Sequence, residues 1–161
     1  MTISDYQSAL VTGASSGIGE AVVEDLSQRG LTVHAVARRA ERLEELKEKT
    51  GCVTHVLDVR DTEEMNELFG SIAPDILINN AGVGRAIDST VNANPEDLDQ
   101  TIDTNVTAAI HAVRAVTPSM IEKGKGHIVN VGSVAGLYPL SSSVYGCLLY
   151  TSDAADEGLG V

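Results

Sequence analysis

The sequence predicts an α/β protein built on one doubly wound parallel sheet. Short apolar runs of strand length alternate with segments of helical periodicity as far as about residue 131. A glycine-rich turn follows the first of these runs, and each later crossover is long enough to hold a helix. Repeated strand–helix–strand units pair their strands in parallel and place helices on both faces of the sheet. The 161 residues have the length of a single domain.

The five predicted strands begin with the apolar run Ala9–Val11. The other four cover residues 31–37, 52–57, 75–79 and 127–131. Apolar residues at helical spacing predict helices after Ile18, over residues 40–49, after Asp61, and from Asn94 to about Lys123. The last of these segments contains Pro118, so we expect a break or a bend there.

Residues suited to helix ends stand at the expected boundaries. Asp61 and Asn94 precede their helices and can accept hydrogen bonds from the first free N–H groups, and Pro95 suits the first helical position. Gly30 and Gly51 stand where the first two helices should end, because glycine adopts the left-handed conformation that closes a helix.

The stretch from Thr12 to Gly19 reads TGASSGIG and lies between a strand and a helix. Its glycines allow positive φ angles and a close approach of the backbone to a pyrophosphate, and the following helix presents free N–H groups. The spacing differs from the usual G-x-G-x-x-G, so a glycine turn without a ligand is the alternative.

Several polar residues follow the predicted strands directly. Arg38, Asp58, Asn80 and Ser133 all stand at strand carboxyl ends, as the glycine turn does. In doubly wound sheets, ligands bind at this edge. The sequence therefore predicts one site there.

Composition excludes several classes of function. A net charge of −12 disfavours nucleic acid as a partner, and no apolar run approaches the length of a membrane span. No basic, apolar-cored leader is seen, so we expect a cytoplasmic protein. Cys52 and Cys147 form no disulfide framework, and the four histidines lack metal-ligand spacing, so no metal site is expected.

From residue 8 to about residue 146, the sequence resembles the short-chain dehydrogenase/reductase family. The octet matches that family's TGxxxGIG motif, residues 79–82 match its NNAG motif, and Asn105, Ser133 and Tyr145 match three of its four catalytic positions. The resemblance implies a Rossmann-type fold, a nicotinamide cofactor, hydride transfer between an alcohol and a carbonyl, and a homodimer or homotetramer. It implies cofactor contacts at Gly13, Ser15, Ser16, Gly17, Ile18, Gly19, Arg38, Arg39, Asp58, Val59, Asn80, Ala81, Gly82 and Tyr145.

The end of the second strand indicates which cofactor is used. A site that prefers NAD places an acid there for the ribose 2′-hydroxyl, but this chain has Ala37 followed by Arg38 and Arg39. Guanidinium groups suit a 2′-phosphate, so the sequence favours NADP over NAD. Arginines that are merely solvated at a helix start are the alternative. By the resemblance, Asp58 meets the adenine amino group, whereas the residue could also cap a loop.

The resemblance gives each catalytic position a role. Tyr145 would exchange the proton with the substrate oxygen, Ser133 would hold that oxygen, and Asn105 would order a water relay. Asn80 is interpreted as an organiser of the backbone. The family's fourth catalytic residue is a lysine four positions after the tyrosine, but this chain has Leu149. An unperturbed tyrosine is only about 0.1% phenolate at pH 7, so without a nearby cation we expect little catalysis.

The C-terminal residues differ in kind from the rest. Residues 147–157 read CLLYTSDAADE, which resembles, residue for residue, a translation of a transposase adapter used in preparing sequencing libraries. We therefore expect residues 1–146 to be an incomplete dinucleotide-binding domain, truncated after its fifth strand, and residues 147–161 to be a non-native tail. A real, divergent C-terminus is the alternative.

The favoured function is an NADP-dependent oxidoreductase acting on a small substrate, present here as an inactive fragment. The context of Arg38 and of Ser133 looks most like that of the 3-hydroxy acid (serine-type) dehydrogenases. A 3-oxoacyl-carrier-protein reductase is the enzymatic alternative. A non-catalytic dinucleotide-binding sensor is the alternative from another class, and Leu149 would suit it if the tail were native.

Overall fold

The computed structural model of the chain describes residues 2–85, 92–136 and 145. The chain divides into two compact units. The first, which we call the sheet unit, comprises Met1–Ala81 and Ala108–Val131. The second unit comprises Gly82–Thr107 and Gly132–Val161.

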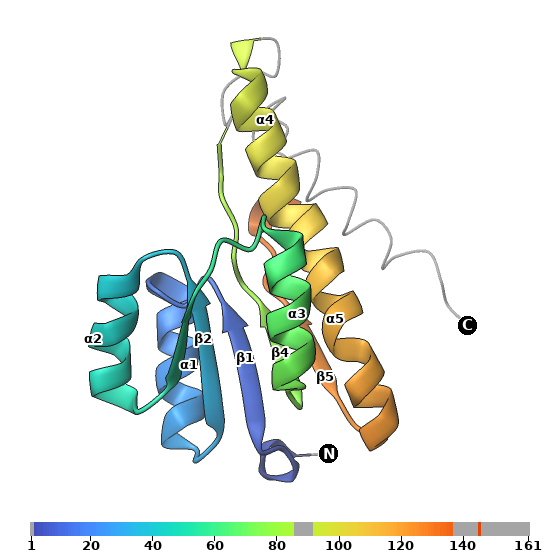
Figure 1. Cartoon of the computed structure of the whole chain (residues 1–161). Coiled ribbons are helices and arrows are strands. Elements are labelled where there is room, and N and C mark those ends of the chain that lie inside the picture. The colour runs from blue at the N-terminus through green and yellow to red at the C-terminus, as the bar shows by residue number, and fades with distance from the viewer. Residues whose placement is uncertain (1, 86–91, 137–144, 146–161) are drawn as a thin grey trace. The chain divides into compact units, whose positions relative to one another are not determined.

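Five parallel strands form the sheet unit, as predicted. They are β1 (Ser8–Thr12), β2 (Thr32–Ala37), β3 (Val53–Val56), β4 (Ile76–Asn79) and β5 (His127–Asn130). Their order across the sheet is β3-β2-β1-β4-β5 (Figure 1). The chain winds outward from β1 to β3 and then returns to the other side of β1. The gap between β1 and β4 is therefore the topological switch point, where such folds bind ligands.

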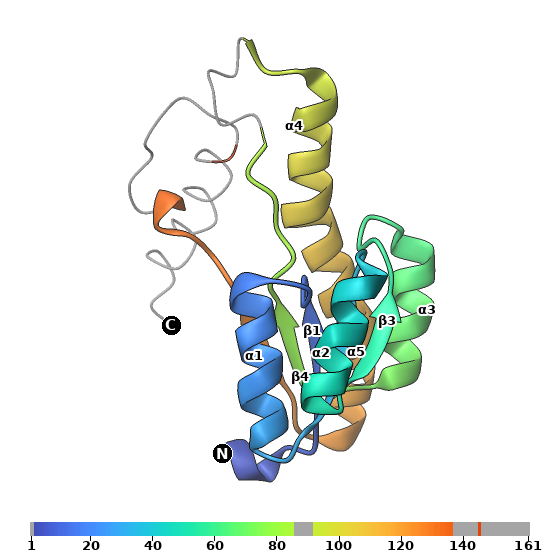
Figure 2. The same ribbon diagram turned by 90° about the vertical axis from the view of Figure 1, so that its left-hand side faces the viewer.

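Helices cover both faces of this sheet (Figures 1 and 2). On one face, α1 (Gly17–Gln28) and α2 (Ala40–Thr50) bury apolar side chains such as Val23 and Leu43. On the other, α3 (Thr62–Ile72) and α5 (Ala108–Lys123) bury Phe69 and Val116. Successive strand residues point to opposite faces, so both apolar clusters draw on the same strands. Burial on both faces explains why these strands read as continuous apolar runs.

The predicted helix ends are confirmed. The Asp61 side chain accepts a hydrogen bond from the Glu64 N–H, and Asn94 caps α4 (Pro95–Ile102) by accepting from the Glu96 N–H. Gly51 closes α2 at φ 72°. A short 3₁₀ turn, η1 (Ile3–Asp5), precedes β1.

Of the break or bend expected at Pro118, the break is wrong. The helix α5 runs through this residue, and the irregularity lies earlier, in the π-helical turn η3 (Asp103–Thr107) that follows α4. Pro118 is exposed, and so is Arg114, whose carbonyl loses its helical donor to the proline. Water can donate a hydrogen bond to the Arg114 carbonyl on this exposed side, so the helix continues past Pro118. A 3₁₀ turn, η4 (Val134–Gly136), follows β5.

Within the described ranges, no helix combines the length and apolar character that a membrane crossing requires.

Candidate dinucleotide-binding and catalytic site

The glycine turn joins β1 to α1 at the carboxyl edge of the sheet. Gly13 and Gly17 have φ angles of 66° and 61°, which side chains disfavour. At Gly19, a Cβ atom would lie 2.5 Å from both the Asn80 amide nitrogen and the Gly13 carbonyl oxygen. Among the described residues, no side chain caps the start of α1. Its first N–H groups therefore suit an anion.

Asn80 connects the end of β4 to this turn. Its side-chain amide donates to the carbonyl oxygens of Thr12 and Gly13, at 3.0 and 3.2 Å. The Thr12 hydroxyl in turn accepts from the main-chain N–H groups of Asn80 and Ala81, each at 3.0 Å. The interpretation of Asn80 as an organiser of the backbone is confirmed. These bonds hold the glycine turn after β1 against the end of β4, at the switch point.

Arg39 lies against the serines of the glycine turn. Its Nε and Nη2 donate to the hydroxyl of Ser15 at 3.1 and 2.9 Å, and Nη2 also donates to the Ser16 hydroxyl at 2.6 Å. The fold thus brings a guanidinium group and two hydroxyl groups together beside the start of α1. This set of donors is chemically suited to a phosphate group.

Arg38, the second predicted phosphate ligand, faces the end of β3. Its Nη1 lies 3.8 Å from the Asp58 carboxylate. Asp58 is held more closely by Arg60, which sequence reasoning missed. The Arg60 hydrogen bonds are the main cause that lowers the pKa of Asp58, with burial acting in the opposite direction. Val59, the next predicted cofactor contact, is buried in the apolar cluster beneath α3 and α5.

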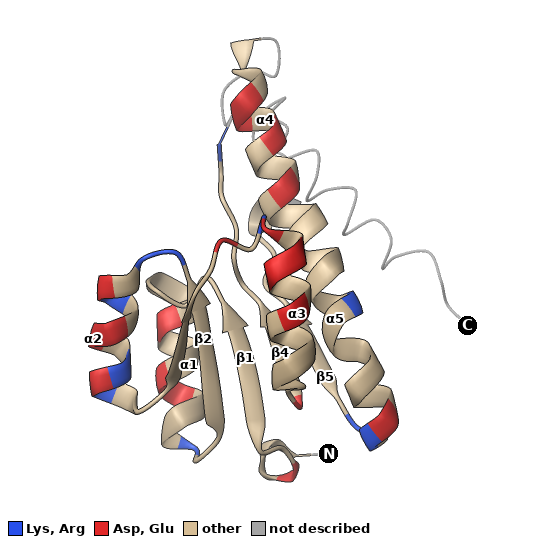
Figure 3. Cartoon of the chain, viewed as in Figure 1, with Lys and Arg blue, Asp and Glu red and all other residues tan. Residues whose placement is uncertain are grey.

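The site's charge differs from that of the chain as a whole. In Figure 3 the link between β2 and α2 is basic, whereas α3 and α4 show acidic positions. That link carries Arg38 and Arg39. A local positive charge in a chain of net charge −12 favours an anionic ligand at this edge.

The three predicted catalytic residues belong to the second unit. The Asn105 side chain pairs with the Val83 main chain: its oxygen accepts from the N–H at 2.8 Å, and its amide donates to the carbonyl at 2.9 Å. The Ser133 hydroxyl accepts from the Ala135 N–H at 3.2 Å. Tyr145 is helical and half-buried. Gly82 also belongs to this unit, and Leu149 lies outside the described residues.

A contact between two histidines was also not predicted from the sequence. His34 Nδ1 and His55 Nε2 lie 3.0 Å apart on the neighbouring strands β2 and β3. Burial lowers the pKa of His34, and burial together with the charge of His34 lowers that of His55. In the part of the chain that the structure describes, no group of three or more His, Cys, Asp or Glu residues could hold a metal.

A parallel sheet with a glycine turn at its switch point is the arrangement of dinucleotide-binding α/β proteins. A family model described as short chain dehydrogenase matches residues 7–147. The chain therefore belongs to the short-chain dehydrogenase family.

Individual relatives are similar over most of this chain. It is 41% identical over 145 residues to the NADP-dependent 3-hydroxy acid dehydrogenase YdfG of Escherichia coli, covering 85% of this chain. The chain spans only 58% of that relative's length. The crystal structure of serine dehydrogenase from Escherichia coli is 38% identical, with a TM-score of 0.85 over 92% of this chain and 72% of that one.

A third similar protein is a short-chain dehydrogenase from Sphingobium yanoikuyae in complex with NADPH. Its structure matches with a TM-score of 0.82 and 33% identity, covering 95% of this chain and 64% of that one.

Proposed function

We propose that the protein is an NADP(H)-dependent oxidoreductase that interconverts a small alcohol and its carbonyl compound. The single observation that carries this proposal is the Arg39 guanidinium placed on Ser15 and Ser16, beside the uncapped start of α1. With Arg38 next to it and no acid at the end of β2, this group suits a 2′-phosphate better than a 2′-hydroxyl. The NADP-dependent relatives support the same choice.

The adenosine half of the cofactor would lie along the carboxyl edge of the sheet. The Asp58 side chain and the main chain of Val59, whose side chain is buried, would border the adenine. Asn80, Ala81 and Gly82 would border the adenosine ribose. The residues of the glycine turn, from Gly13 to Gly19, would hold the pyrophosphate through main-chain N–H groups. The bound cofactor would supply or accept the hydride.

The proton chemistry would fall to the second unit. Tyr145 would exchange a proton with the substrate oxygen, and the Ser133 hydroxyl would hold that oxygen. The Asn105 side chain is already engaged with the Val83 main chain at both ends. Any water relay there would therefore depend on the main chain that Asn105 positions.

For the substrate we propose a 3-hydroxy acid and its 3-oxo acid. The similarity to a 3-hydroxy acid dehydrogenase and to a serine dehydrogenase supports this class. A substrate panel tests it, since activity restricted to carrier-bound acyl chains would instead favour a 3-oxoacyl-carrier-protein reductase.

We further propose that residues 147–161 are not the native continuation of the chain. Leu149 occupies the family's lysine position, and the adapter-like sequence begins at Cys147. The family match, which ends at residue 147, supports this boundary. Reading the genomic DNA beyond the Gly146 codon tests the proposal. A lysine codon at position 149 is expected, whereas an intact Cys147–Glu157 segment would favour a non-catalytic sensor.

Kinetics of the protein expressed from its natural gene test the cofactor. We expect a higher kcat/KM with NADPH than with NADH, and a reversed or abolished preference in Arg38→Asp. Arg114→Asp makes the same charge change at an exposed position on α5 and should keep the preference. Equal or better use of NADH by the unchanged protein would refute the assignment.

A further inference from the structure

Arg60 binds the Asp58 carboxylate at both oxygens. Its Nε lies 3.1 Å from Oδ1 and 3.1 Å from Oδ2, and its Nη2 lies 2.6 Å from Oδ2. The Arg60 main-chain N–H also donates to Oδ1 at 3.1 Å. Such a forked pair is among the strongest side-chain interactions available to a carboxylate.

Arg38 competes for the same carboxylate but holds it far less closely. Its distance to Asp58 is 3.8 Å, and its side chain is 59% exposed, compared with 34% for Arg60. An exposed ion pair at this distance contributes little and rearranges easily. Arg38 can therefore leave Asp58 at small cost when another anion arrives.

Without Arg60, the situation of Arg38 would change. Asp58 would lose its main partner, and Arg38 is the other cation that contacts it among the described residues. A closer pair with Asp58 would engage the Arg38 guanidinium. The unneutralised carboxylate would also repel a phosphate close to Arg38.

We propose that Arg60 is a positioning residue for cofactor specificity, which binds and neutralises Asp58 so that Arg38 stays available to the 2′-phosphate of NADP(H). This inference rests on the proposed function, because it concerns the same cofactor. It adds a residue that does not itself contact the phosphate. The pKa of Asp58 agrees with this order of partners: Arg60 contributes most to lowering it and Arg38 least.

The test measures binding of two adenosine probes by titration calorimetry. Adenosine 2′,5′-bisphosphate carries the 2′-phosphate, and 5′-AMP lacks it. The readout is the ratio of the two affinities, so that a general loss of adenosine binding cancels. Variants are made in the protein expressed from its natural gene, and melting curves confirm that each is folded.

In Arg60→Met, the preference for the bisphosphate should fall about tenfold, the order of one charge-assisted contact. Arg60→Lys keeps the charge but loses the forked pair, so the preference for the bisphosphate should fall less in this variant. The double variant Asp58→Asn/Arg60→Met should recover most of the preference, because the competing carboxylate is gone. Arg29→Met is the matched control and should leave the ratio unchanged, since Arg29 holds the exposed Asp25 by a similar fork at the end of α1.

The outcomes separate this inference from the proposed function. If the unchanged protein binds both probes equally, the NADP assignment itself fails. If the unchanged protein prefers the bisphosphate but Arg60→Met keeps that preference, the role of Arg60 is refuted. A double variant with the same loss as Arg60→Met also refutes it, because the effect would then not pass through Asp58.

Discussion

Asn80 donates two hydrogen bonds to Thr12, one from its main chain to the hydroxyl and one from its side chain to the carbonyl, each at 3.0 Å. The two residues are separated by 68 positions in the sequence. Thr12 ends β1, and Asn80 directly follows the neighbouring parallel strand β4. The pair therefore sets the position of the glycine turn relative to β4.

Thr12→Val tests the stabilising role of this pair. Valine has nearly the shape of threonine but leaves the N–H groups of Asn80 and Ala81 without their acceptor. We expect the free energy of unfolding to fall by about 1–3 kcal/mol, the cost of an unsatisfied donor. Thr12→Ser keeps the hydroxyl and should cost less. Urea denaturation measures both, and an equal loss in the two variants would contradict the hydrogen-bond explanation.

Two glycine substitutions should act in opposite directions. Gly19→Ala would place a methyl group 2.5 Å from the Asn80 amide, so the turn or Asn80 must shift, at about 1–3 kcal/mol. Gly70→Ala lies in the exposed part of α3, where the methyl group would lie 4.0 Å from the Ala115 carbonyl oxygen, its nearest neighbour among the described residues. Alanine is the better helix former, so Gly70→Ala should stabilise by about 0.5–1 kcal/mol. Thermal melts of both variants distinguish a steric clash at Gly19 from the general effect of replacing glycine by alanine in a helix.

Asn105→Asp separates the two halves of the Asn105 side chain. The aspartate keeps an acceptor for the Val83 N–H but turns a second oxygen toward the Val83 carbonyl, in place of the amide donor. In the protein expressed from its natural gene, we expect a loss of about 1–3 kcal/mol at neutral pH, together with reduced activity. Asn94→Asp is the control in the same unit, because either residue can cap α4. Unchanged stability in Asn105→Asp would show that the amide donation is dispensable.

The strands and helix ends could be predicted because their signals are local. Gly51 closes α2 in the left-handed conformation, and Asp61 caps α3 through an N–H three residues away. Apolar runs of strand length indicated a buried parallel sheet, and its order followed the usual winding of such folds. The break at Pro118 was predicted wrongly because the sequence alone does not show which side of this helix faces water.

Side-chain partners across the fold could not be predicted in the same way. The pairing of His34 with His55 depends on the register of β2 and β3, in which Val36 faces His55. Arg60 is two residues from Asp58, but Arg38 was an equally plausible partner by charge, and only side-chain geometry separates them. The glycine motif indicated a phosphate site, whereas the contact of Arg39 with Ser15 required the strand order.

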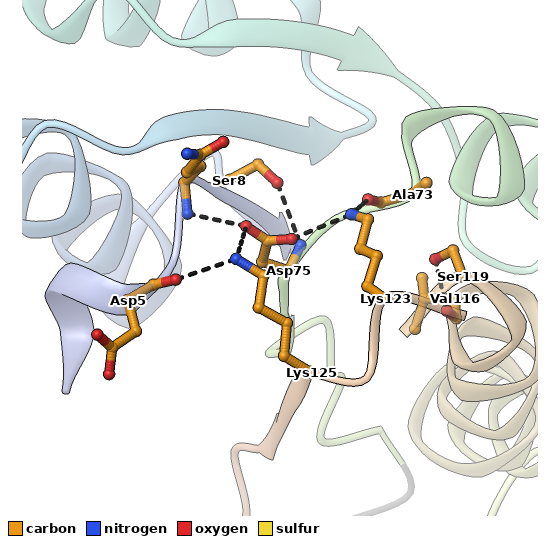
Figure 4. Close-up of polar contacts among 9 residues, drawn as sticks. Asp5, Ser8, Ala73, Asp75, Val116, Ser119, Lys123 and Lys125 are labelled. Carbon is orange, nitrogen blue, oxygen red and sulfur yellow. Dashed lines mark hydrogen bonds and ion pairs between the residues drawn. The ribbon is translucent and has the colours of Figure 1, made fainter. Parts of the chain in front are cut away.

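Asp75 makes another set of side-chain contacts that the sequence does not predict, at the edge of the sheet opposite the glycine turn. The Asp75 side chain is only 6% exposed, and the amino groups of Lys123 and Lys125 lie 3.0 and 3.6 Å from its oxygens (Figure 4). It also accepts from the Gln7 N–H at 2.8 Å. One carboxylate therefore links the segment before β1, the start of β4 and the end of α5.

The stability that Asp75 contributes should depend on pH in a defined direction. Burial alone would raise the pKa of this carboxyl, but the Gln7 N–H and the two lysines outweigh burial and lower it. A lowered pKa means that the folded protein binds fewer protons than the unfolded chain. The stability that Asp75 contributes is therefore complete above the ordinary aspartate pKa, about 3.9. It is lost as the pH falls through the lower pKa of the folded protein. Asp75→Asn should therefore cost about 1–3 kcal/mol at pH 7, and the difference from the unchanged protein should shrink below about pH 4. Asp25→Asn removes the exposed partner of Arg29 and should change little at either pH. Urea denaturation across this pH range checks the prediction, and a deficit in Asp75→Asn that stays constant down to pH 3 would show that shape, not charge, sets the role of Asp75.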